Sequence, residues 1–146
     1  DSFGSLYSED IQYLTAKYLR YAQESGKMLG IHAHNNQQLA YANTIEAIIL
    51  GTSYVDATIA GLGRGAGNCP MELILGFLKN PKYHLRPILE CIEKHIPDLK
   101  RELSWGFDIP YMLTGQFNQH PRSAISFLAE NRRDYTNFYD TMLNCD

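Results

Sequence analysis

The chain has 146 residues, 45% of them hydrophobic, and a formal net charge of −3 at pH 7. This length is sufficient for one domain with a buried core. The slight acidic balance gives no basic surface for nucleic acid, and no apolar run approaches the roughly 18 residues of a membrane span. We therefore expect neither nucleic acid nor a membrane among its partners.

The cysteines and the first residues predict the cellular compartment of the chain and its place in a larger protein. Cys69, Cys91 and Cys145 are odd in number and lack C-x-x-C spacing, which predicts free thiols in a reducing, cytoplasmic compartment. The chain starts at Asp1 without a signal segment, and residues 1–6 resemble a loop that leaves a completed strand. We expect it to begin inside a larger protein.

Residues 1–80 alternate between helical and strand patterns. Apolar residues at helical spacing predict a helix over 8–26 with Ser8 as its N-cap, and a second helix over 39–50. Residues 27–31 and 54–59 read as strands, and a glycine-rich loop then leads into a helix from Pro70 to Phe77. This order predicts an α/β fold built from parallel βαβ units.

Residues 81–146 show helical patterns only. An apolar stripe predicts a helix over 85–96 that ends at Pro97, and another pattern covers 105–117. Two further helical pieces follow Pro121. We therefore divide the chain into an α/β part, 1–80, and a helical part, 81–146, whose aromatic residues suit a core or an interface better than a binding site.

Two histidines follow the strand over 27–31. Side chains two residues apart on a strand point to the same side, so His32 and His34 would converge. Two imidazoles directed at one point suit a divalent metal. The alternative is that one histidine belongs to the core and the other is exposed.

The glycine-rich loop has glycine at positions 61, 63, 65 and 67. Backbone N–H groups in such a loop approach an anion closely, just before a helix N-terminus. The loop also fits the dinucleotide pattern G-x-G-x-x-A, for which Glu90 would bind the ribose. We favour this second interpretation less, because Glu90 lies in a predicted helix and not at the end of a strand.

Several spaced motifs in the first 80 residues resemble one family. They are Gly30-Ile31-His32-Ala33-His34-Asn35-Asn36, Leu39-Ala40-x-Ala42-Asn43, and Val55-Asp56-Ala57 through Gly67-Asn68-x-Pro70-x-Glu72. Together they resemble the metal-dependent aldolase and lyase superfamily of TIM barrels, which includes hydroxymethylglutaryl-CoA lyase. Asn35-Asn36 resembles the 4-hydroxy-2-oxovalerate aldolase branch, since the lyases and synthases carry an aspartate after the histidine pair. The short glycine-rich loop resembles the same branch, since the lyases have a longer loop.

The resemblance implies a fold and a site. Residues 1–80 would be the C-terminal portion of a (β/α)8 TIM barrel, followed by an all-helical region. The residues that match the family's site are listed by role: His32, His34 and Asn68 as metal ligands; Ser2, Gly63 and Gly65 in substrate binding; Tyr111 in catalysis. The family chemistry suits Mn²⁺ best, with Mg²⁺, Co²⁺ and Zn²⁺ as alternatives.

The resemblance also implies a reaction, the cleavage of a 4-hydroxy-2-oxo acid to pyruvate and an aldehyde, with the metal stabilising the enolate. An acylating aldehyde dehydrogenase would be the partner, and the protein would be a homo-oligomer. The family's first-strand aspartate, arginine and histidine have no match here, so we expect the isolated chain to be inactive. The alternatives are an acyl-CoA lyase or condensing synthase of the same superfamily, and a non-catalytic assembly domain.

Overall fold

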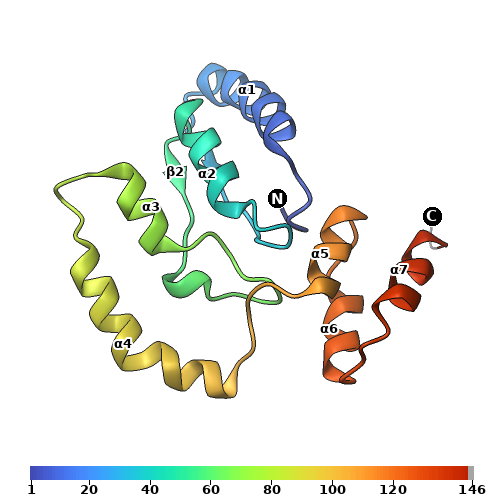
Figure 1. Ribbon diagram of the computed structural model, residues 1–146. Helices are drawn as coiled ribbons and strands as arrows, with labels where there is room; N and C mark the ends of the chain where they lie inside the picture. Colours follow the sequence, from blue (N-terminus) through green and yellow to red (C-terminus); the bar gives the residue numbers. More distant parts are fainter. Residues whose placement is uncertain (145–146) are drawn as a thin grey trace.

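The computed structural model describes residues 1–144, and its helices and strands form an α/β fold (Figure 1). The elements, in chain order, are α1 (Ser8–Glu24), β1 (Gly30–Ile31), α2 (Ala40–Ile49), β2 (Tyr54–Val55), the 3-10 turn η1 (Ile59–Gly61), α3 (Met71–Leu78), α4 (Leu85–Glu102), α5 (Ile109–Gln116), α6 (Arg122–Ala129) and α7 (Tyr135–Leu143).

The two strands form a parallel pair with α2 as the crossover, which confirms the predicted βαβ unit. Gly30 lies opposite Tyr54, and Ile31 lies opposite Val55. Both strands are shorter than the predicted 27–31 and 54–59. The chain leaves β2 because Thr58 pairs with Pro70 in an isolated bridge, which draws the backbone toward α3.

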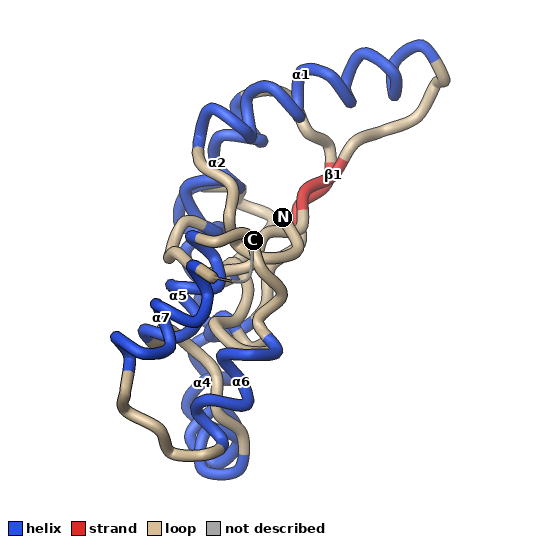
Figure 2. Tube along the Cα trace, turned by 90° about the vertical axis from the view of Figure 1, so that its right-hand side faces the viewer, coloured by secondary structure: helices blue, strands red, loops and turns tan. Residues whose placement is uncertain are grey.

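A small apolar core holds the strand ends in place. Ala33, Ala40, Cys69 and Ile74 are buried together, and side chains of both strands pack against them. Helix α1 packs on α2 beyond this core (Figures 1 and 2). The residues that follow each strand are therefore fixed between α2 and α3.

Two predicted helix ends were wrong. Tyr7, and not Ser8, is the N-cap of α1, because the carboxylate of Asp10 accepts from the Tyr7 N–H at 3.0 Å. Helix α4 continues through Pro97 to Glu102. Pro97 is exposed, so water can hydrogen-bond to the carbonyl that the missing proline N–H leaves free.

The helical region packs around a second apolar cluster. Tyr111, Leu113, Ala124, Phe127, Phe138 and Met142 are buried together with Ala66, which comes from the glycine-rich loop. The predicted helix over 105–117 is shorter than expected, because Asp108 caps α5 by accepting from the Ile109 N–H. The helical region therefore contacts the glycine-rich loop directly, and the division at residue 80 stays a prediction.

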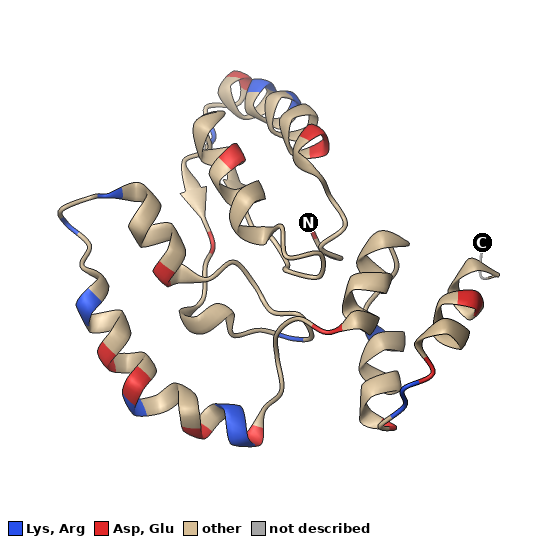
Figure 3. Cartoon of the chain, viewed as in Figure 1, with Lys and Arg blue, Asp and Glu red and all other residues tan. Residues whose placement is uncertain are grey.

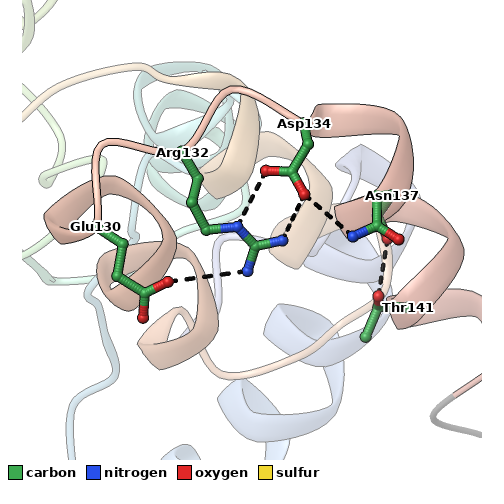
Figure 4. A network of polar contacts seen from close by, with 5 residues as sticks. All are labelled: Glu130, Arg132, Asp134, Asn137 and Thr141. Carbon is green, nitrogen blue, oxygen red and sulfur yellow. Dashed lines mark hydrogen bonds and ion pairs between the residues drawn. The ribbon is translucent and has the colours of Figure 1, made fainter.

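Polar contacts define the turn between α6 and α7 (Figure 4). Arg132 donates two hydrogen bonds to the carboxylate of Asp134, at 3.0 and 2.7 Å, and Asn137 donates to the same carboxylate. The Arg132 guanidinium also lies 4.7 Å from the centre of the Phe127 ring. These bonds hold the pKa of Asp134 well below its usual range. They orient the turn over Phe127, while the exposed charges contribute little stability.

Basic and acidic side chains are mixed along α4 (Figure 3).

Across residues 1–144, no helix is both long enough and apolar enough to cross a membrane. Cys69 and Cys91 are free thiols, and Cys145 lies outside the described residues.

Phe127 is the side chain on which the second cluster depends most, because it is only 1% exposed. Phe127→Ala should lower the free energy of unfolding by about 3–5 kcal/mol, from lost burial and the cavity left behind. Phe107→Ala is the matched control, since Phe107 is 48% exposed. Thermal unfolding followed by circular dichroism measures both, and equal losses would contradict this account of the core.

Candidate functional site

The two histidines lie together just beyond β1. Their ring centroids are 4.8 Å apart, with the ring planes at 73°. The Nδ1 atom of His32 lies 3.2 Å from a carboxylate oxygen of Asp56, and Nδ1 of His34 lies 3.1 Å from the carbonyl oxygen of Asp1. A carbonyl or an ionised carboxylate can only accept, so both rings donate from Nδ1. The lone pair of each Nε2 is left for another partner.

Asp56 is a site residue that the sequence reasoning missed. Its backbone N–H donates to the Ile31 carbonyl at 2.9 Å, which continues the strand pairing by one residue. The pairing of Ile31 with Val55 therefore sets Asp56 beside His32. The signal was present in the sequence, because parallel strands place the residues after their last pair next to each other.

The environment of His34 favours its neutral form. Burial lowers the pKa of His34, and so do the neighbouring His32 and Arg64. A neutral imidazole is the form that binds a metal ion. His34 is therefore suited to act as a ligand.

The glycine-rich loop folds back onto the histidine segment. The Asn35 N–H donates to the carbonyl of Gly67 at 2.9 Å, and His34 forms an isolated antiparallel bridge with Asn68. At the base of the loop, the Asn68 N–H donates to the carbonyl of Gly61 at 3.0 Å. The predicted metal and loop residues are thus brought together by backbone pairing.

Two glycines are required by close approaches within this loop. Gly67 has a φ of +83°, and a Cβ there would lie 2.2 Å from the carbonyl oxygen of Gly61. A Cβ at Gly63 would lie 2.6 Å from the side-chain nitrogen of Asn68. No larger residue fits either position without movement of the backbone or of Asn68.

The Asn68 side chain is held inside the loop. Its amide nitrogen donates to the Leu62 carbonyl at 3.1 Å. Its Oδ1 atom is buried and has no hydrogen-bond partner among the residues that the structure describes. An unpaired buried oxygen costs free energy, so this atom is suited to accept a hydrogen bond or to bind a cation.

Tyr111 packs against the loop at Gly65. A Cβ at Gly65 would lie 3.1 Å from the Tyr111 ring, so the glycine admits the aromatic side chain. Burial, followed by the charge of Asp108, raises the pKa of Tyr111, which keeps the phenol protonated. The buried Asn36 amide donates to the Tyr111 carbonyl at 3.3 Å and joins α5 to the histidine segment. The sequence reasoning quoted Asn36 but assigned it no contact.

Ser2 lies in the first turn of the chain, and its side chain is exposed. Its hydroxyl makes no hydrogen bond within the described part of the chain. The neighbouring Asp1 is the residue in direct contact with the histidines, because its carbonyl accepts from His34 and its amine donates to the His32 carbonyl. The role predicted for Ser2 stays a prediction.

The atoms that could bind a metal ion here are of suitable types but few in number. Nowhere in residues 1–144 do three or more His, Cys, Asp or Glu side chains form a group that could hold a metal ion. The two free Nε2 atoms and the unpaired Asn68 oxygen fit a divalent cation in chemistry. Further ligands, from water, substrate or other residues, are needed to complete such a site.

Sequence comparison places the chain in a family. Residues 4–93 match the model of the HMGL-like family, so the chain belongs to the HMGL-like family. It is 40% identical over 97 residues to the 4-hydroxy-2-oxovalerate aldolase of Thermus thermophilus, covering 64% of this chain and 27% of the relative. It is 41% identical over 80 residues to the oxaloacetate decarboxylase of Mycobacterium tuberculosis, covering 54% of this chain and 23% of the relative.

Structural comparison agrees with this placement. The crystal structure of the N-terminal domain of a proposed aldolase from Bacteroides vulgatus matches with a TM-score of 0.69 and 32% identity, over 87% of this chain and 42% of that one. The chain spans about a quarter of the length of the curated relatives it matches. The fold and the family are therefore shared, whereas the whole relatives contain much more sequence.

Substitution of Gly67 tests whether the loop serves binding or folding. Gly67→Val should weaken Mn²⁺ binding by about tenfold, because a Cβ would meet the Gly61 carbonyl and move the loop, with Asn68, away from the histidine segment. We expect a smaller relative change in thermal stability. Gly76→Ala is the control, because a Cβ at this exposed helical position meets nothing within 4 Å. Equal losses of binding and stability in Gly67→Val would indicate a purely structural loop.

Proposed function

We propose that this chain supplies the histidine side of a divalent-metal-dependent aldolase that cleaves a 4-hydroxy-2-oxo acid to pyruvate and an aldehyde. The observation that carries the proposal is the anchoring of both imidazoles through Nδ1, to Asp56 and to the Asp1 carbonyl. A histidine that binds a metal generally donates its other ring N–H to such an acceptor, which fixes the tautomer and the ring orientation.

The proposed fold of the complete enzyme is a (β/α)8 barrel, to which residues 1–80 contribute late strands and helices. The parallel pair with its helical crossover supports this proposal, as does the position of the histidines and the glycine-rich loop after the C-terminal ends of the strands. Active sites of such barrels lie at that end. A barrel needs eight strands and about 250 residues, so most of its sheet would come from residues outside this chain.

Each residue has a defined task in the proposed reaction. His32 and His34 would hold the metal through Nε2, with the Asn68 oxygen as a third donor. A divalent cation, Mn²⁺ in our proposal, would supply Lewis-acid stabilisation of negative charge on the substrate keto oxygen. Gly63 and Gly65 would bind the substrate carboxylate only through backbone N–H groups of the loop, because the Asn68 and Tyr111 side chains fill the space that a Cβ at these glycines would take. Tyr111, which packs beside Gly65 and keeps its phenol protonated, would serve in catalysis.

A second candidate is decarboxylation of a 2-oxo acid such as oxaloacetate. The similarity to the Mycobacterium tuberculosis oxaloacetate decarboxylase favours it. Both reactions break a carbon–carbon bond and leave charge on the same keto-derived oxygen, so one site could serve either. The acyl-CoA lyase and synthase reactions remain alternatives within the superfamily, and a non-catalytic assembly role remains the alternative outside enzymes.

The proposed setting is a cytoplasmic homo-oligomer that passes its aldehyde to an acylating aldehyde dehydrogenase through the helical region. Exposed apolar side chains on and near α4 support an interface there, namely Leu85, Leu89 and Leu103, which are 40%, 46% and 52% exposed. The buried centre of an interface is more apolar than the rest of a protein surface.

Metal binding tests the histidine assignment directly. His34→Ala should weaken Mn²⁺ binding at least tenfold, because one of few protein ligands is lost, as measured from the electron paramagnetic resonance signal of free Mn²⁺. His95→Ala is the matched control, since His95 is an exposed residue of α4. Equal Mn²⁺ affinities of the two variants would contradict the assignment.

Activity tests the proposal as a whole. We expect no turnover of 4-hydroxy-2-oxovalerate or oxaloacetate by the isolated 146 residues with Mn²⁺, because an open piece of a barrel lacks most of its sheet and the remaining ligands. The full-length product of the gene should release pyruvate, measured by coupling to lactate dehydrogenase. Turnover of neither substrate by the full-length product would refute the proposed activity. Turnover by the isolated chain comparable to that of the full-length product would refute the proposal that the isolated chain lacks part of the active site.

A further inference from the structure

The segment between α4 and α5 binds the glycine-rich loop through two hydrogen bonds. The indole N–H of Trp105 donates to the Ala60 carbonyl at 3.0 Å. The backbone N–H of Gly106 donates to the Gly65 carbonyl, also at 3.0 Å. We call residues 103–108 the strap. In Figure 1 this segment rises from the end of α4 and passes the tip of the loop before α5 begins.

Both acceptor carbonyls belong to residues with a left-handed backbone. Ala60 has a φ of +53° and Gly65 a φ of +65°. Alanine rarely adopts positive φ, so the surrounding structure must maintain this conformation. The strap donates one hydrogen bond to each of these two carbonyls. Ala60 lies just before the loop, and Gly65 lies near its tip.

The Trp105 ring also covers the base of the loop. Its Cδ1 atom is 3.5 Å from the position that a Cβ on Gly67 would take. The ammonium of Lys100 lies 4.9 Å from the centre of the indole, which holds the ring in place from the side of α4. Gly67 is the residue whose carbonyl accepts from Asn35, next to His34. Trp105 therefore lies against Gly67, and Gly67 in turn is hydrogen-bonded to the histidine segment.

We propose that Trp105 and Gly106 are positioning residues, which hold the glycine-rich loop against His34 so that Asn68 and the loop backbone stay in place for the metal and the 2-oxo acid. This inference rests on the proposed function. It assigns a role to residues beyond the 4–93 region that matches the family model. Among residues 1–144 no hydrogen bond joins the strap to either histidine, so in this proposal it acts through the loop.

The test removes the donor and keeps a ring. Trp105→Phe should weaken Mn²⁺ binding in the presence of pyruvate about fivefold, the factor expected for loss of one hydrogen bond. It should also speed amide exchange at Gly67 and Asn68, whose N–H groups donate within the loop. Phe107→Leu is the control from the same strap, at a side chain that is 48% exposed. Exchange in α2 and α6 shows whether each variant is folded.

The outcomes separate the two proposals. Weaker Mn²⁺ binding together with faster loop exchange, at unchanged exchange in α2 and α6, supports the strap. Faster loop exchange with unchanged Mn²⁺ affinity would show a structural contact only and overturn the positioning role. Unchanged loop exchange, or an equal effect of Phe107→Leu, would overturn it as well. All Mn²⁺ titrations in this test use the full-length protein, and absence of Mn²⁺ binding by its unsubstituted form would instead overturn the proposed function, and the positioning role with it.

Discussion

The hydrogen bond from the Asn35 N–H to the Gly67 carbonyl joins two segments that no regular sheet connects. Strands β1 and β2 are each two residues long, and their pairing continues only to the bond from the Asp56 N–H to the Ile31 carbonyl. The Asn35–Gly67 bond and the adjoining bridge between His34 and Asn68 are the direct backbone links between the loop and the histidine segment. The tight approach of Gly67 to Gly61 is what lets the loop turn back far enough to form it.

The polar groups around this junction have complementary tasks. Asp56 and the Asp1 carbonyl orient the imidazoles, while Asn68 leaves one oxygen buried and unpaired. Burial lowers the pKa of His34 and raises the pKa of Tyr111, so each side chain is held in its neutral form. Such divergent settings are characteristic of sites that perform acid–base or metal chemistry.

Sequence patterns predicted the elements better than their ends. The βαβ order and the later helices follow from apolar periodicity, which local residues determine. Strand length does not, because Thr58 leaves the sheet to pair with Pro70, a contact set by tertiary structure. Pro97 predicts a helix end, but an exposed proline can lie within a helix, as it does in α4. The contact between His32 and Asp56 was within reach of register reasoning, whereas that of Trp105 with Ala60 joins positions 45 apart and has no local signal.

The packing of Ala66 among residues of α5, α6 and α7 has a consequence for how the molecule can be divided. The region that matches the family model stops inside α4, but the loop it contains is completed by side chains that come afterwards. A boundary drawn at residue 93 would expose Ala66 to water and remove the aromatic ring that covers Gly65. The region recognised by the family model thus stops before the residues that bury part of it, and a chimaera between relatives should not be joined between β1 and α7.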